Sequence, residues 1–527
     1  MIRIAVIVFI WALAISFGVS ALTVSPWLWL VAVLCAGIAG LGTYDLLQKR
    51  HSVLRNYPVL GHIRFMLESI RPELQQYFIE RNTDGRPYDR DVRSLVYQRA
   101  KGTEAEIAFG TERNVYAEGY EYFESSMRPR PVPAEQPRVR IGGPDCTKPY
   151  DMALLNVSAM SFGSLSSNAI LALNQGAALG GFAHDTGEGG MSEYHLRHGG
   201  DLVWEIGTAY FGCRTPDGGF DRARFAEKTA RDNVKCVSLK LSQGAKPGIG
   251  GVLPGEKVTA EIARVREVPE GQTVISPPYH QVFDTPRELI RFIAEIRELS
   301  GGKPVGFKLC VGSRREFLAV CKAMLEEGTA PDFIIVDGAE GGTGAAPLEF
   351  ADHLGSPLTE GLITVHNALV GVGLRDRVKI GASGKVATGA DIVKRMLQGA
   401  DFTNAARAMM FAIGCIQAQS CHTNTCPAGV ATQDPRRARA LDVDDKSARV
   451  HRFQSATVNS ALQIIASLGV SEPAELRPSM LRRRVDPVTV RSYAELYDWL
   501  TPGQLLIEPP ESWAVDWKAA DPDRFAV

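Results

Sequence analysis

Three cysteines near residue 420 are the residues whose types and spacing most directly suggest chemistry. Cys415, Cys421 and Cys426 have C-x5-C-x4-C spacing, and Pro427 follows the last of them. Iron–sulfur clusters are held by cysteine thiolates, and a cubane that lacks one iron needs three of them. A structural zinc site usually has four ligands. The spacing therefore favours a [3Fe–4S] cluster, with zinc or buried free thiols as the alternatives.

Five glycine-rich turns are the second feature with chemical meaning. A single turn of this kind is usually structural, because glycine tolerates tight backbone conformations. Five of them suggest a large flat ligand that is held through backbone N–H groups. The turns are Met160-Ser-Phe-Gly-Ser164, Thr186-Gly-Glu-Gly-Gly190, Gln243-Gly-Ala-Lys-Pro-Gly-Ile-Gly-Gly251, Asp337-Gly-Ala-Glu-Gly-Gly-Thr-Gly344 and Ser383-Gly384.

The elements that must position these residues follow a repeated pattern. Short apolar runs alternate with amphipathic segments of helix length, which is typical of βα units. Predicted helices include 63–81 before this region and, within it, 287–299, 315–327, 389–398 and 448–468. The predicted strands are residues 154–160, 181–186, 236–241, 273–276, 305–311, 333–337, 378–382 and 402–406.

Eight such units predict an α/β fold of the (β/α)8 or TIM-barrel type. In this fold ligands bind at the loops that follow the strands, so all five turns would open onto one face. The loops after the last two strands are the usual phosphate site. A doubly wound sheet is the alternative, but no G-x-G-x-x-G fingerprint opens a helix after the first strand.

Six ordered motifs resemble the FMN-binding synthase domain of glutamate synthase, over about residues 150–470. The resemblance implies a TIM barrel with FMN at its mouth that reduces 2-iminoglutarate to glutamate. The cysteine spacing is also that of the [3Fe–4S] cluster of this family. The motifs are Met160-Ser-Phe-Gly-Ser-Leu-Ser166, Thr186-Gly-Glu-Gly-Gly190, Gly244-Ala-Lys-Pro-Gly248, Ile275-Ser-Pro-Pro278, Gly341-Gly-Thr-Gly-Ala-Ala-Pro347 and Cys421-His-Thr-Asn-Thr-Cys-Pro427.

The resemblance also implies the site residues. Lys246 and Arg266 occupy positions where the family holds its 2-oxo acid, and Glu188 is a polar or proton-handling partner. Met160, Gly163 and Ser164 are expected beside the substrate. The expected FMN-binding residues are Ser161, Thr186, Lys240, Gln243, Lys308, Gly341, Gly342, Thr343, Gly384, Ala406 and Arg407.

The chain departs from the family pattern at three points. The seventh-strand loop is Gly381-Ala-Ser-Gly-Lys385, where an Asp-Gly-Gly turn is usual. The eighth-strand loop is Asn404-Ala-Ala-Arg407, where a Gly-x-Gly-Thr turn is usual. Lys385 and Arg407 are therefore candidate cationic partners of the phosphate. Val252 replaces a glutamine that contacts substrate, which suggests a different 2-oxo acid or imine.

Two apolar stretches precede the barrel, at residues 4–24 and 27–46, and only Asp45 interrupts the second. Each reaches about 30 Å, the thickness of a bilayer core. Arg3 precedes the first stretch, and Lys49, Arg50 and Arg55 follow the second. The positive-inside rule then predicts a two-helix membrane hairpin with the catalytic domain in the cytoplasm. A signal peptide ending near Val19-Ser20-Ala21 and a pair of buried core helices are the alternatives.

The predicted domains are residues 1–50, the membrane hairpin; 51–150, an extension that packs on the barrel; 151–475, the barrel with its iron–sulfur loop; and 476–527, a tail. With 58 Lys and Arg against 59 Asp and Glu, no net charge selects nucleic acid as a partner. Nine cysteines in 527 residues are too few for a disulfide-stapled secreted protein.

The predicted function is that of an oxidoreductase that makes an amino acid from a 2-oxo acid and ammonia. Met1-Ile2 leads directly into the first apolar stretch, so we expect no glutaminase nucleophile and an ammonia source that is free or a separate subunit. No nicotinamide site is evident, so ferredoxin or an NAD(P)H-dependent reductase is the expected donor. The alternative is a membrane-tethered electron relay or a non-catalytic barrel.

Overall fold

The structure is a computed structural model that describes residues 2–103 and 106–525. This part of the chain forms two compact units, which divide between Arg90 and Asp91. The first unit holds α1 (Ile2–Thr23), α2 (Leu28–Leu47), α3 (Ser52–Asn56), α4 (Gly61–Leu74) and the π-helical turn η1 (Gln75–Ile79). Helix α4 and η1 together correspond to the helix predicted at 63–81.

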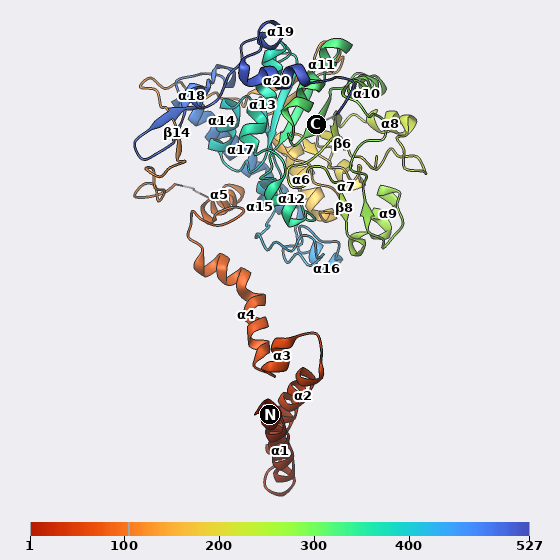
Figure 1. The fold of residues 1–527 in the computed structure, drawn as a ribbon, viewed down its shortest axis with the longest axis vertical. Coiled ribbons are helices and arrows are strands. Elements are labelled where there is room, and N and C mark those ends of the chain that lie inside the picture. Colours follow the sequence, from red (N-terminus) through yellow and green to blue (C-terminus); the bar gives the residue numbers. More distant parts are fainter. Residues whose placement is uncertain (1, 104–105, 526–527) are drawn as a thin grey trace. The chain divides into compact units, whose positions relative to one another are not determined.

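Helices α1 and α2 pack against each other as a hairpin (Figure 1). The indole Nε1 of Trp11 donates to Thr43 Oγ1 at 3.1 Å, which links the two helices. Both are long and apolar enough to cross a membrane, as the sequence predicts. The one carboxylate in α2 is partnered: Asp45 is buried, and its oxygens accept from the Val59 backbone N–H at 2.9 Å and lie 2.9 Å from His62 Nε2.

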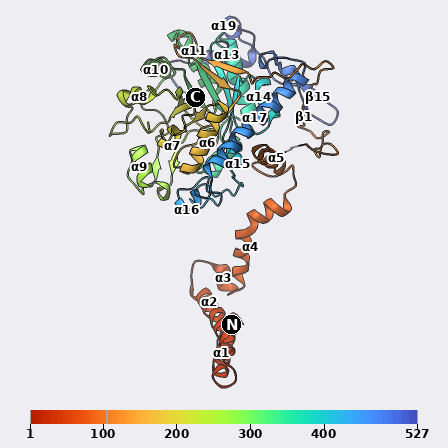
Figure 2. The same ribbon diagram turned by 180° about the vertical axis from the view of Figure 1, so that it is seen from behind.

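The second unit is a closed barrel of eight parallel strands, surrounded by helices (Figures 1 and 2). The predicted TIM-barrel fold is therefore confirmed. Going round the barrel in chain order, the strands are β4 (Leu155–Val157), β5 (His184–Asp185), β6 (Leu202–Ile206), β7 (Val234–Lys240), β10 (Val305–Leu309), β11 (Phe333–Asp337), β12 (Lys379–Ser383) and β13 (Phe402–Ala405).

One predicted barrel strand is wrong. Residues 273–276 contain β9 (Val274–Ile275), which pairs antiparallel with β8 (Val252–Leu253) outside the barrel. The missing barrel strand is β6, which pairs with β5 and β7. Both segments are short and apolar, so pairing with distant strands decides which one enters the barrel. The other seven predicted strands each overlap an observed one.

Capping residues explain where the surrounding helices start and stop. Ser166, Thr285 and Ser313 precede α6, α10 and α11, and the side chain of each accepts a hydrogen bond from a backbone N–H of the first turn. Pro286 is the first residue of α10, a position where proline is favoured. Gly328 ends α11 in the left-handed region, at φ 67°. The longer helices of this unit are α5 (Arg90–Lys101), α6 (Ser167–Gly180), α8 (Arg222–Thr229), α10 (Pro286–Leu299), α11 (Arg314–Glu327), α13 (Leu358–Gly371), α14 (Gly389–Leu397), α17 (Val443–Ser467) and α20 (Glu511–Ala519).

Short helices lie mostly in the loops. They are α7 (Glu193–Leu196), η2 (Gly255–Lys257), α9 (Ala260–Arg266), α12 (Leu348–His353), α15 (Arg407–Ala412), α16 (Pro435–Ala438), η3 (Pro473–Glu475), η4 (Pro478–Met480), α18 (Tyr493–Leu496) and α19 (Gln504–Ile507).

The β2–β3 hairpin and the tail pack onto the barrel domain. The hairpin of β2 (Arg138–Ile141) and β3 (Tyr150–Ala153) contributes Ile141 and Met152 to a core that also contains Phe333 and Phe402 of the barrel. In the tail, β14 (Leu481–Arg484) pairs with β15 (Val490–Ser492) and with β1 (Glu121–Phe123). Helix α20 packs on α11, where the Arg314 guanidinium lies 4.6 Å from the Trp513 ring centre.

Candidate active site

The predicted site residues come from different strands but meet at one end of the barrel. Lys240 and Lys308 are directly paired residues near the carboxyl ends of β7 and β10. The remaining site residues lie in the loops that follow the strands. In a parallel barrel these ends form one rim, so residues that are far apart in the sequence lie close together in space.

Glu188 is the central anion of the site. Its Oε1 lies 2.8 Å from Lys240 Nζ, and both side chains are largely buried. Burial opposes the charged form of Glu188, but Lys240, with Arg266 and Lys246 near it, lowers its pKa to about 2. Glu188 is therefore a carboxylate at neutral pH. Glycines make room for it: a Cβ at Gly251 would overlap Oε1, and one at Gly207 would lie 2.7 Å from its Cβ.

Residues 241–285 follow β7, which is the fourth strand of the barrel, and we call this segment the strand-4 excursion. It carries the predicted substrate-binding cations. Lys246 is 2% exposed, and its ammonium donates to the Gly250 carbonyl at 2.9 Å. Burial lowers the pKa of Lys246, and the Glu188 carboxylate partly opposes this. Glu188 and Lys246 therefore belong to one charged cluster at the rim.

Arg266, at the end of α9 in the same excursion, is held from two sides. Its Nη2 donates to the Phe162 carbonyl at 3.0 Å, and its guanidinium lies 5.1 Å from the centre of the Phe211 ring. Burial lowers its pKa to about 10, and Glu188 opposes this. Its Nε is buried and has no hydrogen-bond partner among the residues that the structure describes. A buried cation with a spare donor is suited to bind an anionic ligand.

A second buried ion pair joins two strands of the barrel. Lys308 of β10 bonds to Glu205 of β6, and both are nearly inaccessible. Burial opposes the charge on Lys308, but Glu205 and Asp185 raise its pKa. Burial and the neighbouring Glu205 raise the pKa of Asp185. The sequence prediction missed both carboxylates: Glu205 lies in β6, which was not predicted as a barrel strand, and Asp185 lies in the predicted strand β5 but outside the glycine turns.

The loops after β11, β12 and β13 approach one another at the opposite part of the rim. Arg407 Nη2 donates to the Glu340 carbonyl at 2.7 Å, and a Cβ at Gly342 would lie 3.1 Å from Arg407 Nη1. Gly384 has a φ of 147°, and Lys385 follows it with a φ of 51°. Ala406 precedes α15, which Arg407 begins. Arg407 thus contacts the predicted glycine turn directly.

The remaining predicted residues line the same rim. Residues 160–164 follow β4, and Gly163 has a φ of 102° that an L-residue rarely adopts. Thr186 Oγ1 accepts from the Glu205 backbone N–H at 3.1 Å. The Gln243 carbonyl accepts from the Lys246 N–H, and the Gly341 N–H donates to the Gly338 carbonyl. Met160, Ser161, Ser164 and Thr343 complete the set in these loops.

The three predicted cluster ligands lie in residues 413–434, which we call the cysteine loop, between α15 and α16. Burial, with smaller contributions from Cys421 and Cys426, raises the pKa of Cys415 to about 12, so the three thiols are within electrostatic range of one another. The Cys415 sulfur accepts from the Gln417 N–H at 3.5 Å. On the outer side of the loop, the Tyr97 hydroxyl of α5 donates to the Cys415 carbonyl at 2.7 Å.

In the described part of the chain, no three His, Cys, Asp or Glu side chains are grouped so as to hold one metal ion.

Similarity to known proteins identifies the family of this chain. Residues 138–471 match the conserved region in glutamate synthase. The chain is 38% identical over 470 residues to the glutamate synthase large subunit-like protein YerD of Bacillus subtilis, a match that covers 81% of this chain and 89% of that protein. The chain belongs to the glutamate synthase family.

Two further proteins show weaker similarity. The archaeal glutamate synthase (NADPH) of Methanocaldococcus jannaschii is 33% identical over 330 residues, which is 62% of this chain and 61% of that protein. A solved structure of mandelate oxidase with (S)-4-hydroxymandelic acid has a TM-score of 0.44 at 13% identity and covers 75% of this chain and 98% of its own. Membership of the glutamate synthase family indicates an FMN-barrel oxidoreductase.

The loops fit an FMN group of the kind that glutamate synthases use. The Gly244 N–H donates to Asp337 Oδ2 at 2.8 Å, and a Cβ at Gly244 would overlap the Gly338 carbonyl. Only glycine allows these two loops to approach so closely. Beside them, Lys240 and Lys308 are buried cations at the carboxyl ends of their strands. The site therefore combines a backbone cradle with fixed positive charge.

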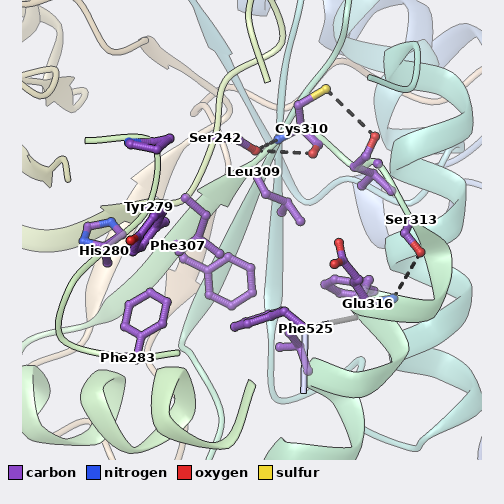
Figure 3. A pocket seen from close by; sticks show the side chains of 16 residues that line it. Ser242, Tyr279, His280, Phe283, Phe307, Leu309, Cys310, Ser313, Glu316 and Phe525 are labelled. Carbon is purple, nitrogen blue, oxygen red and sulfur yellow. Dashed lines mark hydrogen bonds between the residues drawn. The ribbon is translucent and has the colours of Figure 1, made fainter. Parts of the chain in front are cut away.

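A separate apolar pocket has a volume of about 210 Å³, and Figure 3 shows the side chains that line it. It is lined by aromatic side chains of the strand-4 excursion, β10, α11 and the tail, including Tyr279, Phe307, Phe317 and Phe525. None of the predicted site residues lines it. It adjoins the charged site through His280, whose Nε2 lies 2.9 Å from the Lys240 carbonyl oxygen.

Proposed function

We propose that this chain reduces an imine, formed from a 2-oxo acid and ammonia, to an amino acid, with 2-oxoglutarate as the expected 2-oxo acid. The observation that supports this is the cluster of Lys246, Arg266 and the Lys240–Glu188 pair at the barrel rim. A dicarboxylate needs fixed cations, and Arg266 has a buried Nε with no partner among the described residues. A simple electron relay would not need such a site.

Each charged residue of the site has its own role in the proposed reaction. Arg266 and Lys246 bind the carboxylates, and Glu188 stays ionised and holds Lys240 in place. The 2-oxo acid and ammonia condense to the imine and water; the imine carbon then takes a hydride and its nitrogen a proton. Lys246 is the candidate proton donor, because burial lowers its pKa and so makes its ammonium a stronger acid.

FMN would be held by the glycine loops, with Ser161, Thr186, Lys240, Gln243 and Lys308 near its ring and Gly384, Ala406 and Arg407 near its phosphate. When bound, FMN supplies the hydride. Cys415, Cys421 and Cys426 would hold a [3Fe–4S] cluster, which supplies electrons one at a time. The names of relatives include NADPH and ferredoxin, so one of these donors, through a separate protein, is the expected source of electrons.

We further propose that α1 and α2 anchor the chain in a membrane with the barrel in the cytoplasm. Both helices have apolar side chains on all sides, and at most 22% of each apolar window is buried within the protein. A soluble core helix would be covered by other elements. Arg3 and the basic residues after α2 favour the cytoplasmic side for both ends.

The test is spectroscopic. Detergent-solubilised protein should carry FMN and about three irons per chain. The flavin is reduced anaerobically, 2-oxoglutarate and ammonia are added, and the return of the oxidised flavin band is followed. We expect reoxidation by the wild type, loss of it in Arg266→Ala, and no effect of Arg264→Ala, an exposed residue of the same helix.

Two outcomes would contradict the proposal. Colourless protein after anaerobic purification would rule out both cofactors. Flavin that responds to none of a panel of 2-oxo acids with ammonia would favour the electron-relay function instead.

Replacing Cys421 with Ser should remove the iron and leave the barrel folded, because the ligands lie on a loop. Unchanged iron content would show that the ligand assignment is wrong.

A further inference from the structure

Lys257 is a buried cation between the substrate site and the cysteine loop. It lies in η2 of the strand-4 excursion and is 3% exposed. Its ammonium donates to the Ser164 carbonyl at 3.0 Å and to the Ala431 carbonyl at 3.2 Å. Ser164 belongs to the loop after β4, and Ala431 belongs to the cysteine loop. One side chain therefore bonds two loops that are distant in sequence.

A neighbouring side chain joins the same two loops. Gln433 Nε2 donates to the carbonyls of Gly163 and Leu165 at 3.0 and 2.8 Å. Gln433 is neutral, so its two bonds already hold the loops together without a charge. A second neutral donor in place of Lys257 would serve the same structural purpose at a lower desolvation cost.

The charge of Lys257 is therefore the feature that needs an explanation. Among the described residues no carboxylate lies within 4.0 Å of its ammonium, and burial lowers its pKa. The groups that oppose this lowering are Cys421 and Cys426, while Arg266 adds to it. Burying an ammonium without an anion is costly. The anion that fits this position is the one carried by the cysteine loop itself.

We propose that Lys257 is a positioning residue whose buried charge compensates the thiolate-held iron–sulfur cluster and raises its reduction potential. The inference rests on the proposed cluster at Cys415, Cys421 and Cys426. Each electron that enters the cluster from the external donor adds one negative charge and no proton. A fixed cation nearby stabilises the reduced state over the oxidised one. Lys257 also bonds directly to the loop that carries Ser164, so the same side chain contacts the substrate side.

The test replaces the charge and measures the potential. Lys257→Met and Lys257→Gln remove it, Lys257→Arg keeps it, and Arg264→Gln removes an exposed charge from the adjacent helix. Iron content and the electron paramagnetic resonance signal establish whether the cluster is present. Anaerobic redox titration then gives the cluster and flavin potentials separately.

We expect Lys257→Met and Lys257→Gln to retain iron and to shift the cluster equilibrium at least tenfold toward the oxidised form, which is about 59 mV for one electron. The flavin potential should move less, and Lys257→Arg and Arg264→Gln should stay near wild type. Iron-loaded variants with an unchanged cluster potential overturn this inference alone. Wild-type protein without iron overturns the proposed cluster and this inference with it. If neither uncharged variant retains iron, Lys257 is needed for the loop itself, and the electrostatic role is rejected.

Discussion

Buried charged side chains at the mouth of the barrel fall into two groups. Lys240 and Lys308 have carboxylate partners, Glu188 and Glu205. Arg266 and Lys257 bond only to carbonyls among the described residues, as Lys246 does. A buried pair is costly to break from one side, so the paired residues form a fixed frame. The cations without carboxylates are the ones free to meet an anionic ligand.

The Lys240–Glu188 pair gives a pH-dependent prediction. The pKa of Glu188 falls from its ordinary 4.5 to about 2 in the folded chain. A depressed carboxyl pKa contributes stability above the unfolded pKa, and this stability is lost as pH falls from about 4.5 to about 2. Lys240→Met should therefore destabilise the protein at neutral pH, by an amount on the order of 3 kcal/mol. The difference from wild type should shrink toward pH 2.

Thermal unfolding of detergent-solubilised protein over a pH series measures this effect. The double variant Glu188→Gln with Lys240→Met is the control, since it has no carboxylate to leave unpaired. It should recover part of the stability at neutral pH and lose the pH dependence that belongs to the pair. A Lys240→Met penalty that stays constant down to pH 2 would contradict the assignment.

Val252 gives a prediction about substrate preference. It lies in β8 at a position where the resemblance implies a substrate-contacting glutamine, and a lost polar contact costs roughly 1–3 kcal/mol. Val252→Gln should therefore tighten 2-oxoglutarate binding by roughly fivefold to a hundredfold. Titration of the flavin spectrum with the 2-oxo acid measures the change. The same exchange at exposed Val488 is the control; equal effects at both positions would show that Val252 does not contact substrate.

At the scale of elements, the strand-4 excursion brings most of the charge to the site. Its β8–β9 ladder returns the chain to the rim, and Val252 pairs with Ile275 there. Sequence reasoning predicted residues 273–276 as a barrel strand, because an isolated apolar run carries no information about its partners. Glycine turns and cysteine spacing were recognisable because their chemistry is local. Lys257 was missed because its partners, Ser164 and Ala431, are close only after folding.

Replacing Gly251 with alanine tests whether the strand-4 excursion must approach Glu188 closely. A Cβ there would overlap Glu188 Oε1, so Gly251→Ala should push the carboxylate away from Lys240. Overpacking of this kind typically costs about 1–3 kcal/mol. We expect at least tenfold weaker 2-oxo acid binding (about 1.4 kcal/mol) with flavin retained. Gly312→Ala is the matched control, since nothing lies within 4 Å of the added Cβ; unchanged binding in Gly251→Ala would show that the loop can move aside.

At the scale of the whole molecule, the division between Arg90 and Asp91 separates two kinds of surface. The first unit exposes large apolar side chains along both long helices, including Phe9, Leu30 and Leu34. The second unit buries its apolar residues in the barrel core and between strands and helices. Exposed apolar area of this extent marks a membrane or protein contact. Its confinement to one compact unit predicts that the two can be separated.

A chain that begins at Asp91 should therefore fold as a soluble protein and keep its flavin and iron, because the described barrel, the tail and all of α5 except its first residue, Arg90, lie in the second unit. The full chain should sediment with membranes and need detergent. Lysines at exposed Val33 and Leu34, in the first half of α2, should weaken this association, since a lysine costs up to about 2.5–3.5 kcal/mol at the centre of a membrane helix. Fractionation, flavin absorbance and iron content are measured for the Asp91 chain, the full chain and the lysine variant side by side.

Full-length protein in the soluble fraction would contradict the anchor. A mature chain that has lost its first helix, seen by mass spectrometry, would identify a signal peptide instead. Protease added to intact cells settles the orientation: a barrel that survives lies in the cytoplasm, where a soluble electron donor can reach the cysteine loop.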